Sequence, residues 1–230
     1  MSARAWELRV AGTLAVLGLL AGVTLATAAA AQAAPELVVA DHSRSDLKHY
    51  DTFTWQTALV TGVTDAAAAR IVGTVDSVVQ RNLRQAVRAG RDGCFGLESP
   101  CGFFASTLSK LNCATGVLCV EYVRGAIYPG AATSSPATTV MVFDPATGAR
   151  LPITSVVPAA RMPAFLKAVA ATLKKHQKQE GFYDPFLTPT IRANDLRDWA
   201  PLANGIEIWF PKYFAGPGAA GVVSIIVPYA

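Results

Sequence analysis

The C-terminal segment constrains the fold of this chain more than any other part. Residues 206–210 and 222–229 are rich in Ile, Val and aromatic residues, a composition typical of strands, and a Gly- and Pro-rich stretch separates them. This stretch places Gly216, Gly218 and Gly221 at the spacing of a dinucleotide-binding loop. Such a loop must open a helix, whereas a Val- and Ile-rich segment follows here. We therefore predict two strands joined by a tight crossing, and no cofactor site.

The N-terminus has the parts of a secretory signal peptide. A weakly basic start with Arg4 and Arg9 precedes an uncharged run rich in Ala, Leu and Val over residues 10–31. Ala-Gln-Ala at residues 31–33 has the small-x-small form of a cleavage site. Because the run is also long enough to cross a bilayer, an uncleaved signal anchor is the alternative. We expect residues 1–33 to be removed, which makes the mature protein secreted or associated with the cell wall.

The charge of the chain is mild, with a formal net charge of +4. On the predicted helices, a cluster of lysines stands out at Lys167, Lys174, Lys175 and Lys178, and a solvated helix face explains it. Nucleic acid is a poor partner for an exported protein, so none is expected. Weak attraction to anionic cell-surface polymers stays open.

The four cysteines agree with export, because an even number of cysteines in a secreted chain indicates disulfides. Cys113 and Cys119 flank a segment that looks like a hairpin turn around Gly116, and Cys94 and Cys101 enclose a short loop. We expect these two local bridges, with nested pairing of Cys94 with Cys119 and Cys101 with Cys113 as the alternative. The gaps of six and five residues are too long for the usual zinc ligands, so no metal is expected.

The first half of the chain predicts one strand and one long helix. Residues 34–49 are polar and irregular, which favours a tether, and the aromatic and β-branched composition of residues 50–61 predicts a strand. Asp65 is expected to cap a helix that ends between Gly90 and Gly93. Apolar residues recur three and four apart along one face of this helix: Ile71, Val72, Val75, Val78, Val79, Leu83 and Val87.

The second half predicts further strands and a second helix. Strand-like runs are expected at residues 103–111, 118–128 and 138–143, a turn at 144–148, and a short strand or extended arm at 151–157. A helix starts near Pro163 and stops at Gly181, and an ordered loop with a short helical turn covers residues 182–203. These elements predict an α+β domain over residues 50–230, with a mainly antiparallel sheet packed by two amphipathic helices.

Several of these segments, in this order, resemble the RsiV-like domain family. The resemblance rests on a strand ending in Tyr128, the Val-Met-Val-Phe-Asp-Pro-Ala-Thr-Gly run at residues 140–148, an amphipathic helix, and the ending at residues 213–229. The family includes the extracytoplasmic, lysozyme-sensing part of RsiV-type anti-sigma factors and secreted immunogenic proteins of mycobacteria. The resemblance implies an exported domain with a β-grasp-like C-terminal half and no catalysis of its own. Residues 129–136 lack the histidine that many relatives carry there.

No catalytic set of residues is visible. His42 and His49 lie in the predicted tether, where a metal cluster is less common than a solvated polar segment. Glu121 and Glu207 lie on predicted strands, where a pair of carboxylates would serve a glycosidase if they met. Nothing in the sequence brings them together, so an enzyme acting on the cell envelope is the alternative function.

Aromatic residues are the better indication of function. Most aromatic side chains fill cores, but exposed ones anchor protein and glycan partners. The candidates for partner binding are Tyr128, Trp199, Trp209 and Tyr213. We expect a secreted binding domain without catalytic activity, whose partner is a protein or a cell-envelope polymer. If the signal segment is retained, the chain is instead a membrane-anchored extracytoplasmic sensor domain.

Overall fold

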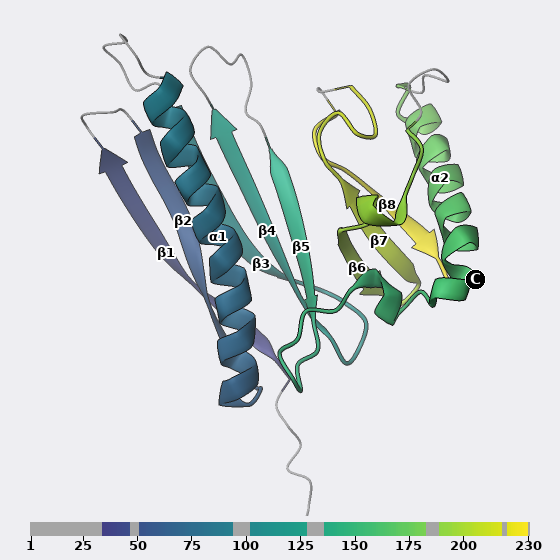
Figure 1. The fold of residues 1–230 in the computed structure, drawn as a ribbon, viewed down its shortest axis with the longest axis horizontal. Helices are drawn as coiled ribbons and strands as arrows, with labels where there is room; N and C mark the ends of the chain where they lie inside the picture. Colours follow the sequence, from purple (N-terminus) through teal and green to yellow (C-terminus); the bar gives the residue numbers. More distant parts are fainter. Residues whose placement is uncertain are drawn as a thin grey trace, which may run out of the picture. The chain divides into compact units, whose positions relative to one another are not determined.

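The computed structural model describes residues 34–46, 51–93, 102–127, 136–182, 189–217 and 220–229. These residues form an α+β fold whose strands are divided between two sheets, each packed by one long helix (Figure 1). The predicted fold class is therefore confirmed, although the sequence did not indicate that the strands divide into two sheets. No helix in the described ranges is long and apolar enough to cross a membrane.

The larger sheet has five strands in the order of the sequence: β1 (Glu36–Asp46), β2 (Asp51–Thr61), β3 (Gly102–Leu111), β4 (Leu118–Ile127) and β5 (Ala137–Phe143). All neighbours are antiparallel except β2 and β3, which are parallel because the long helix α1 connects them. The β2–β3 register is short, and beyond it the side-chain oxygen of Gln56 accepts the Leu108 N–H at 2.6 Å.

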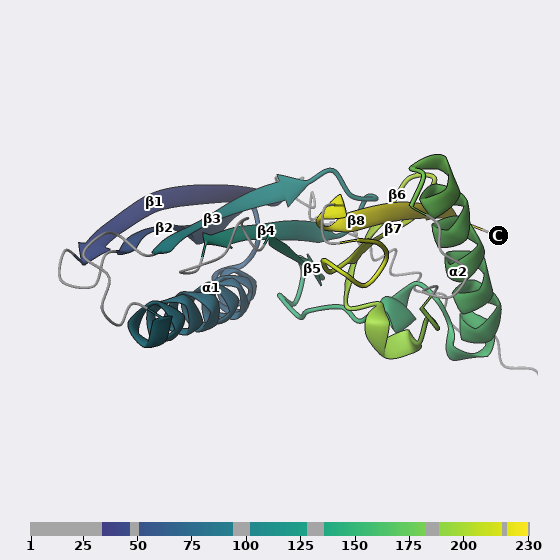
Figure 2. The same ribbon diagram turned by 90° about the horizontal axis from the view of Figure 1, so that it is seen from above.

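Helix α1 (Asp65–Gly93) covers one face of this sheet, as Figures 1 and 2 show. The apolar spacing predicted this helix correctly. Its cap is one residue earlier than expected, since the Thr64 hydroxyl accepts the Ala67 N–H at 3.3 Å and Asp65 lies in the first turn. The buried side chains of the helix and the sheet form two clusters. The smaller contains Phe53, Ala86, Phe104 and Ala126, and the larger contains Val60, Ile71, Val75, Val78, Val79, Leu108, Leu118, Val120, Tyr122, Met141 and Phe143.

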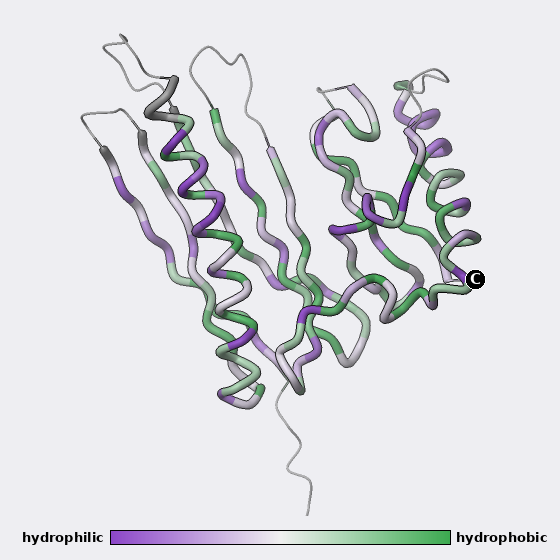
Figure 3. Tube along the Cα trace, viewed as in Figure 1, coloured by the Kyte–Doolittle hydropathy of each residue, from purple (hydrophilic) through white to green (hydrophobic). Residues whose placement is uncertain are grey.

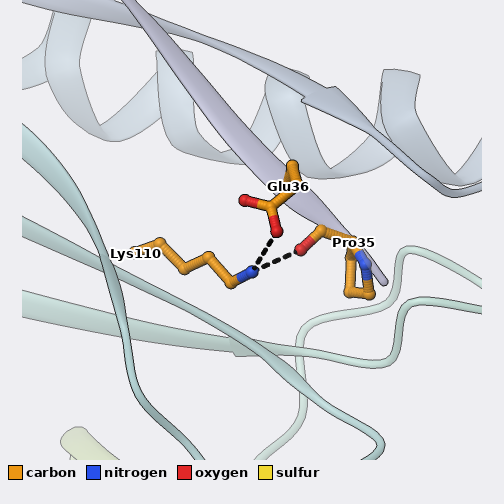
Figure 4. A network of polar contacts seen from close by, with 3 residues as sticks. All are labelled: Pro35, Glu36 and Lys110. Carbon is orange, nitrogen blue, oxygen red and sulfur yellow. Dashed lines mark hydrogen bonds and ion pairs between the residues drawn. The ribbon is translucent and has the colours of Figure 1, made fainter. Parts of the chain in front are cut away.

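Strand β1 corrects the interpretation of residues 34–49 as a tether. All 11 residues of β1 pair with β2 in antiparallel register, from Glu36 opposite Thr61 to Asp46 opposite Asp51. The segment has a largely polar sequence because it forms the edge strand of the sheet, where most of its side chains are exposed to water. Lys110 of β3 holds its start, donating to the Pro35 carbonyl at 2.6 Å and pairing with Glu36 at 3.1 Å (Figure 4).

The smaller sheet contains β6 (Asp198–Leu202), β7 (Gly205–Phe210) and β8 (Val223–Pro228), which are antiparallel with β7 in the centre. Helix α2 (Met162–Gln179) packs against it through Val169 and Leu173, which are almost completely buried. The glycine-rich stretch leads into strand β8, which confirms the two strands predicted for the C-terminal segment.

Two segments differ from their predictions, and proline explains both. The expected strand or arm at residues 151–157 contains the 3-10 helix η1 (Ile153–Ser155), bounded by Pro152 and followed by Pro158, which have no N–H for a sheet. Residues 182–203 contain the expected helical turn, η3 (Ala193–Asp195), but also the unpredicted strand β6. Pro201 argued against a strand there, and β6 accommodates it because it lies at the edge of its sheet.

The smaller sheet is tied to the larger one by polar contacts and a disulfide-bonded turn. The Asp198 carboxylate of β6 accepts the Val140 N–H of β5 at 2.9 Å, and the Pro201 carbonyl accepts the Ala114 N–H at 2.7 Å. Ala114 lies inside the turn closed by the disulfide between Cys113 and Cys119. This bridge was predicted, and it excludes the nested pairing; the bridge proposed for Cys94 and Cys101 lies outside the described residues.

Candidate functional site

The outward face of α1 carries a stripe of arginines. Successive positions three and four apart share this face, because an α-helix has 3.6 residues per turn. The stripe residues are Arg70, Thr74, Ser77, Arg81, Arg84 and Arg88, and all but the partly buried Thr74 are exposed. They extend over about 27 Å of the helix at its rise of 1.5 Å per residue. Figure 3 shows hydrophilic (purple) and apolar (green) residues alternating along α1.

A shallow depression lies beside the first half of the arginine stripe. It has a volume of about 450 Å³, and its lining joins α1 residues such as Arg70 and Arg81 to Arg150, which follows the turn after β5. Arg70 Nη1 donates to the Thr147 carbonyl at 3.2 Å, and Arg150 Nη2 donates to the Val140 carbonyl at 3.3 Å. These bonds fix two of the guanidinium groups at the wall of the depression.

The turn that brings Arg150 to α1 is held by its own side chains. Asp144 accepts the Ala146 N–H at 2.9 Å and the Thr147 hydroxyl at 2.8 Å, and these bonds hold the pKa of the Asp144 carboxyl below its usual range. Gly148 has a φ of 70° and lies against the backbone of Ala67 in α1. The turn predicted at residues 144–148 is therefore confirmed, and it docks onto the helix.

No acidic residue lies among the stripe positions from Arg70 to Arg88, although α1 contains one further acid, Asp92, four residues after Arg88. The only acids of its first 25 or so residues are Asp65, in the first turn, and Asp76. Asp76 is turned toward β2, where its carboxylate accepts the Ala58 N–H and burial raises its pKa. The Thr74 and Ser77 hydroxyls donate to carbonyls of the preceding helical turn, at 2.9 and 2.8 Å, so the guanidinium groups are the donors left for a ligand.

This arrangement suits an extended anion. Arginine presents several N–H donors in a planar fork that matches phosphate and carboxylate oxygens. Arg81, Arg84 and Arg88 follow one another at three- and four-residue spacing, and Arg70 lies eleven residues before the first of them. Several guanidinium groups along one helix face bind successive charges of a polymer better than a single small anion, because each contact releases a counterion.

Of the aromatic residues predicted to bind a partner, the three that the structure describes do not form one exposed surface. Trp199 is only 3% exposed and belongs to the core of the smaller sheet, so it is a packing residue and not a surface anchor. Trp209 is partly buried against the same core. Tyr213 is 72% exposed, with the Lys212 ammonium 5.1 Å from its ring centroid, and Tyr128 lies outside the described residues.

The residues considered for catalysis are also separated. Glu121 lies on β4 of the larger sheet and accepts the Ser109 hydroxyl at 3.1 Å, whereas Glu207 lies on β7 of the smaller sheet. His42 belongs to β1, where it stacks on Trp55 at 5.4 Å and contacts Thr57 Oγ1 at 2.9 Å. In the ranges that the structure describes, no three His, Cys, Asp or Glu residues are placed to hold a metal. His49 lies outside these ranges.

The sequence contained the signal for the arginine stripe, but the helix was interpreted only by its apolar face. Positions 70, 74, 77, 81, 84 and 88 have the same three- and four-residue spacing as the core positions, and begin one residue before Ile71, which is about 100° around the helix. Arg150 could not have been added from the sequence, because its place beside α1 depends on how the turn after β5 docks.

Solved structures with this fold include two members of one family. A DUF3298 family protein from Pseudomonas aeruginosa has a TM-score of 0.59 and 14% sequence identity, over 85% of this chain and 90% of that chain. A member of the DUF3298 family from Bacteroides fragilis has a TM-score of 0.58 and 12% identity, over the same shares of the two chains. No family model matches the chain, and no curated protein is similar to it in sequence. At such identities the likeness shows the fold alone.

Proposed function

We propose that this chain is an exported, non-catalytic binding domain that recognises an anionic polymer of the cell envelope. The observation that carries the proposal is the arginine stripe on α1, whose positions from Arg70 to Arg88 follow one helix face and include no acidic residue. Its ligand is a chain of phosphate or carboxylate groups, bound by Arg70, Arg81, Arg84 and Arg88 in succession, with Arg150 beside the first of them.

Export is supported by the uncharged run at residues 10–31, the small residues at 31–33 and the disulfide between Cys113 and Cys119, since disulfides persist in oxidising compartments. The motifs at residues 140–148 and 213–229 carry the proposed relation to RsiV-like domains, including those of secreted mycobacterial proteins. N-terminal sequencing of the protein from culture filtrate tests export: a start near Ala34 is expected, and retention of residues 1–33 in the membrane would contradict it.

Binding to poly(glycerol phosphate) tests the function. The chain that begins at Ala34 is expected to bind this polymer and not neutral dextran at low salt. The double substitution Arg81→Gln and Arg84→Gln should weaken binding about tenfold or more, because two charged contacts are lost. Neither side chain makes a hydrogen bond or ion pair with another described residue, so thermal stability should not change.

The matched control removes the same charge from the other helix. Lys167→Gln with Lys175→Gln lowers the net charge equally on the exposed side of α2. This control should bind the polymer almost as well as the unchanged chain. If both double variants lose affinity equally, the attraction depends on net charge alone, and the arginine stripe is not the binding site.

A further inference from the structure

A second depression lies far along the chain from the arginine stripe, between α2 and the smaller sheet. Its volume is about 380 Å³, within the range of small-molecule sites. Ile206 of β7 and Val227 of β8, each 2% exposed, and the buried Val157 form its inner wall. Phe165 of α2 lies on the facing wall.

The depression exists because α2 presents small residues there. Arg161, just before α2, and Ala164 and Ala168 within it lie three and four positions apart, on the side of the helix that lines the depression. A helix packed on a sheet normally fills such positions with large apolar side chains, as Val169 and Leu173 do elsewhere on α2. Leucine at residue 168 would occupy part of the space.

The lining is apolar except at its mouth. Arg161 is the only charged residue in the lining, and it makes no side-chain hydrogen bond or ion pair with another described residue. Tyr229, 50% exposed, stands at the same site and adds an aromatic ring with a hydroxyl group. The site therefore offers an apolar interior and one cationic group.

We infer that this depression binds a single acyl chain that carries an anionic headgroup, with the chain against Ile206 and Val227 and the head on Arg161. A sugar does not suit the site, because its hydroxyl groups would lose their hydrogen bonds to water against apolar side chains. An uncharged hydrocarbon would gain nothing from the exposed Arg161 guanidinium, whereas an anionic headgroup would pair with it. The inference does not depend on the proposed polymer binding, which uses another helix.

Titration calorimetry with decanoate, decyl phosphate and decanol tests the inference on the chain that begins at Ala34. Both anions should bind, with the stronger of the two identifying the headgroup, and decanol should bind at least about tenfold more weakly because it lacks the charge-assisted contact. Shortening the chain should weaken binding about fourfold per methylene removed. Equal binding of decanol and the anions, or no binding of any probe, would overturn the inference.

Two substitutions in α2 locate the site. Ala168→Leu should abolish binding of decanoate by filling the depression, whereas the matched change Ala171→Leu, on an exposed position outside its lining, should not. Arg161→Gln should remove the preference for the anions over decanol, and Arg161→Lys should keep it. Arg81→Gln with Arg84→Gln should leave decanoate binding unchanged. Unaltered decanoate binding by a folded Ala168→Leu variant would place the ligand elsewhere.

Discussion

Single residues of the turn at 144–148 decide how the edge of the larger sheet meets α1. Asp144 organises the turn through its carboxylate, and Gly148 adopts the left-handed conformation that glycine takes most readily. A Cβ added at Gly148 would collide with the backbone carbonyl of Ala67. Glycine is therefore needed here for two reasons, its φ and the close approach of the helix.

The effect of the positive φ can be separated from that of the close approach by comparing Gly148 with Gly116. Gly116 also has a positive φ, of 90°, but an added Cβ would meet no atom within 4 Å. Gly116→Ala should lower the free energy of unfolding by about 1 kcal/mol through backbone strain, and Gly148→Ala by about 3 kcal/mol through strain and collision. Urea denaturation of both variants measures the difference. Equal losses would mean that the turn does not pack against α1 as described.

The carboxyl group of Asp198 gives a pH-dependent prediction. Its burial between β6 and β5 raises its pKa above the ordinary value of 3.8, although the Val140 N–H, Arg150 and Arg197 oppose the shift. A carboxyl group whose pKa is higher in the folded state than in the unfolded state contributes its full stability at pH values below the unfolded-state pKa. This contribution is lost as the pH rises through the folded-state pKa. Asp198→Asn keeps an acceptor for Val140 but does not titrate.

The stability of Asp198→Asn relative to the unchanged chain should therefore rise between about pH 3 and about pH 7. Urea denaturation of both proteins at each pH measures this, and all other titrating groups cancel in the comparison. A relative stability that falls with pH would show that the charged partners outweigh burial at this site.

Among the secondary-structure elements, strand β1 differs most from what its sequence suggested, which was a solvated tether. Its residues look solvated because they are exposed, yet its backbone completes the larger sheet beside β2. The side chains of Lys110 and Glu36 are 36% and 61% exposed, and ion pairs in contact with water contribute little to stability. Backbone pairing with β2 therefore stabilises the strand more than this ion pair does.

Removal of β1 should therefore destabilise the domain. A chain beginning at Asp51 is expected to lose about 2 kcal/mol or more relative to one beginning at Ala34, and to aggregate more readily because the edge of β2 is exposed. Lys110→Met should cost less than about 1 kcal/mol. Equal thermal stability of the two chain lengths would restore the interpretation of this segment as a tether.

For the molecule as a whole, the sequence predicted the elements that have strong internal patterns. Helices α1 and α2 were found because core side chains recur every three or four residues, and the Cys113–Cys119 bridge because its loop is local. Strand β1 was missed because most of its side chains are exposed, and strand β6 because it contains Pro201. Both are edge strands, whose conformation depends on pairing with the neighbouring strand more than on their own composition. The site combines α1 with Arg150, so it depends on tertiary packing that no local pattern contains.

The outer face of α1 is proposed to bind a polyanion through successive arginines. The most direct measurement is the salt dependence of binding to poly(glycerol phosphate), as the slope of log K against log salt concentration. Removing Arg81 and Arg84 together should reduce this slope by about two, one for each lost contact, while the Lys167 and Lys175 control keeps it. An unchanged slope in the arginine variant would contradict the claim.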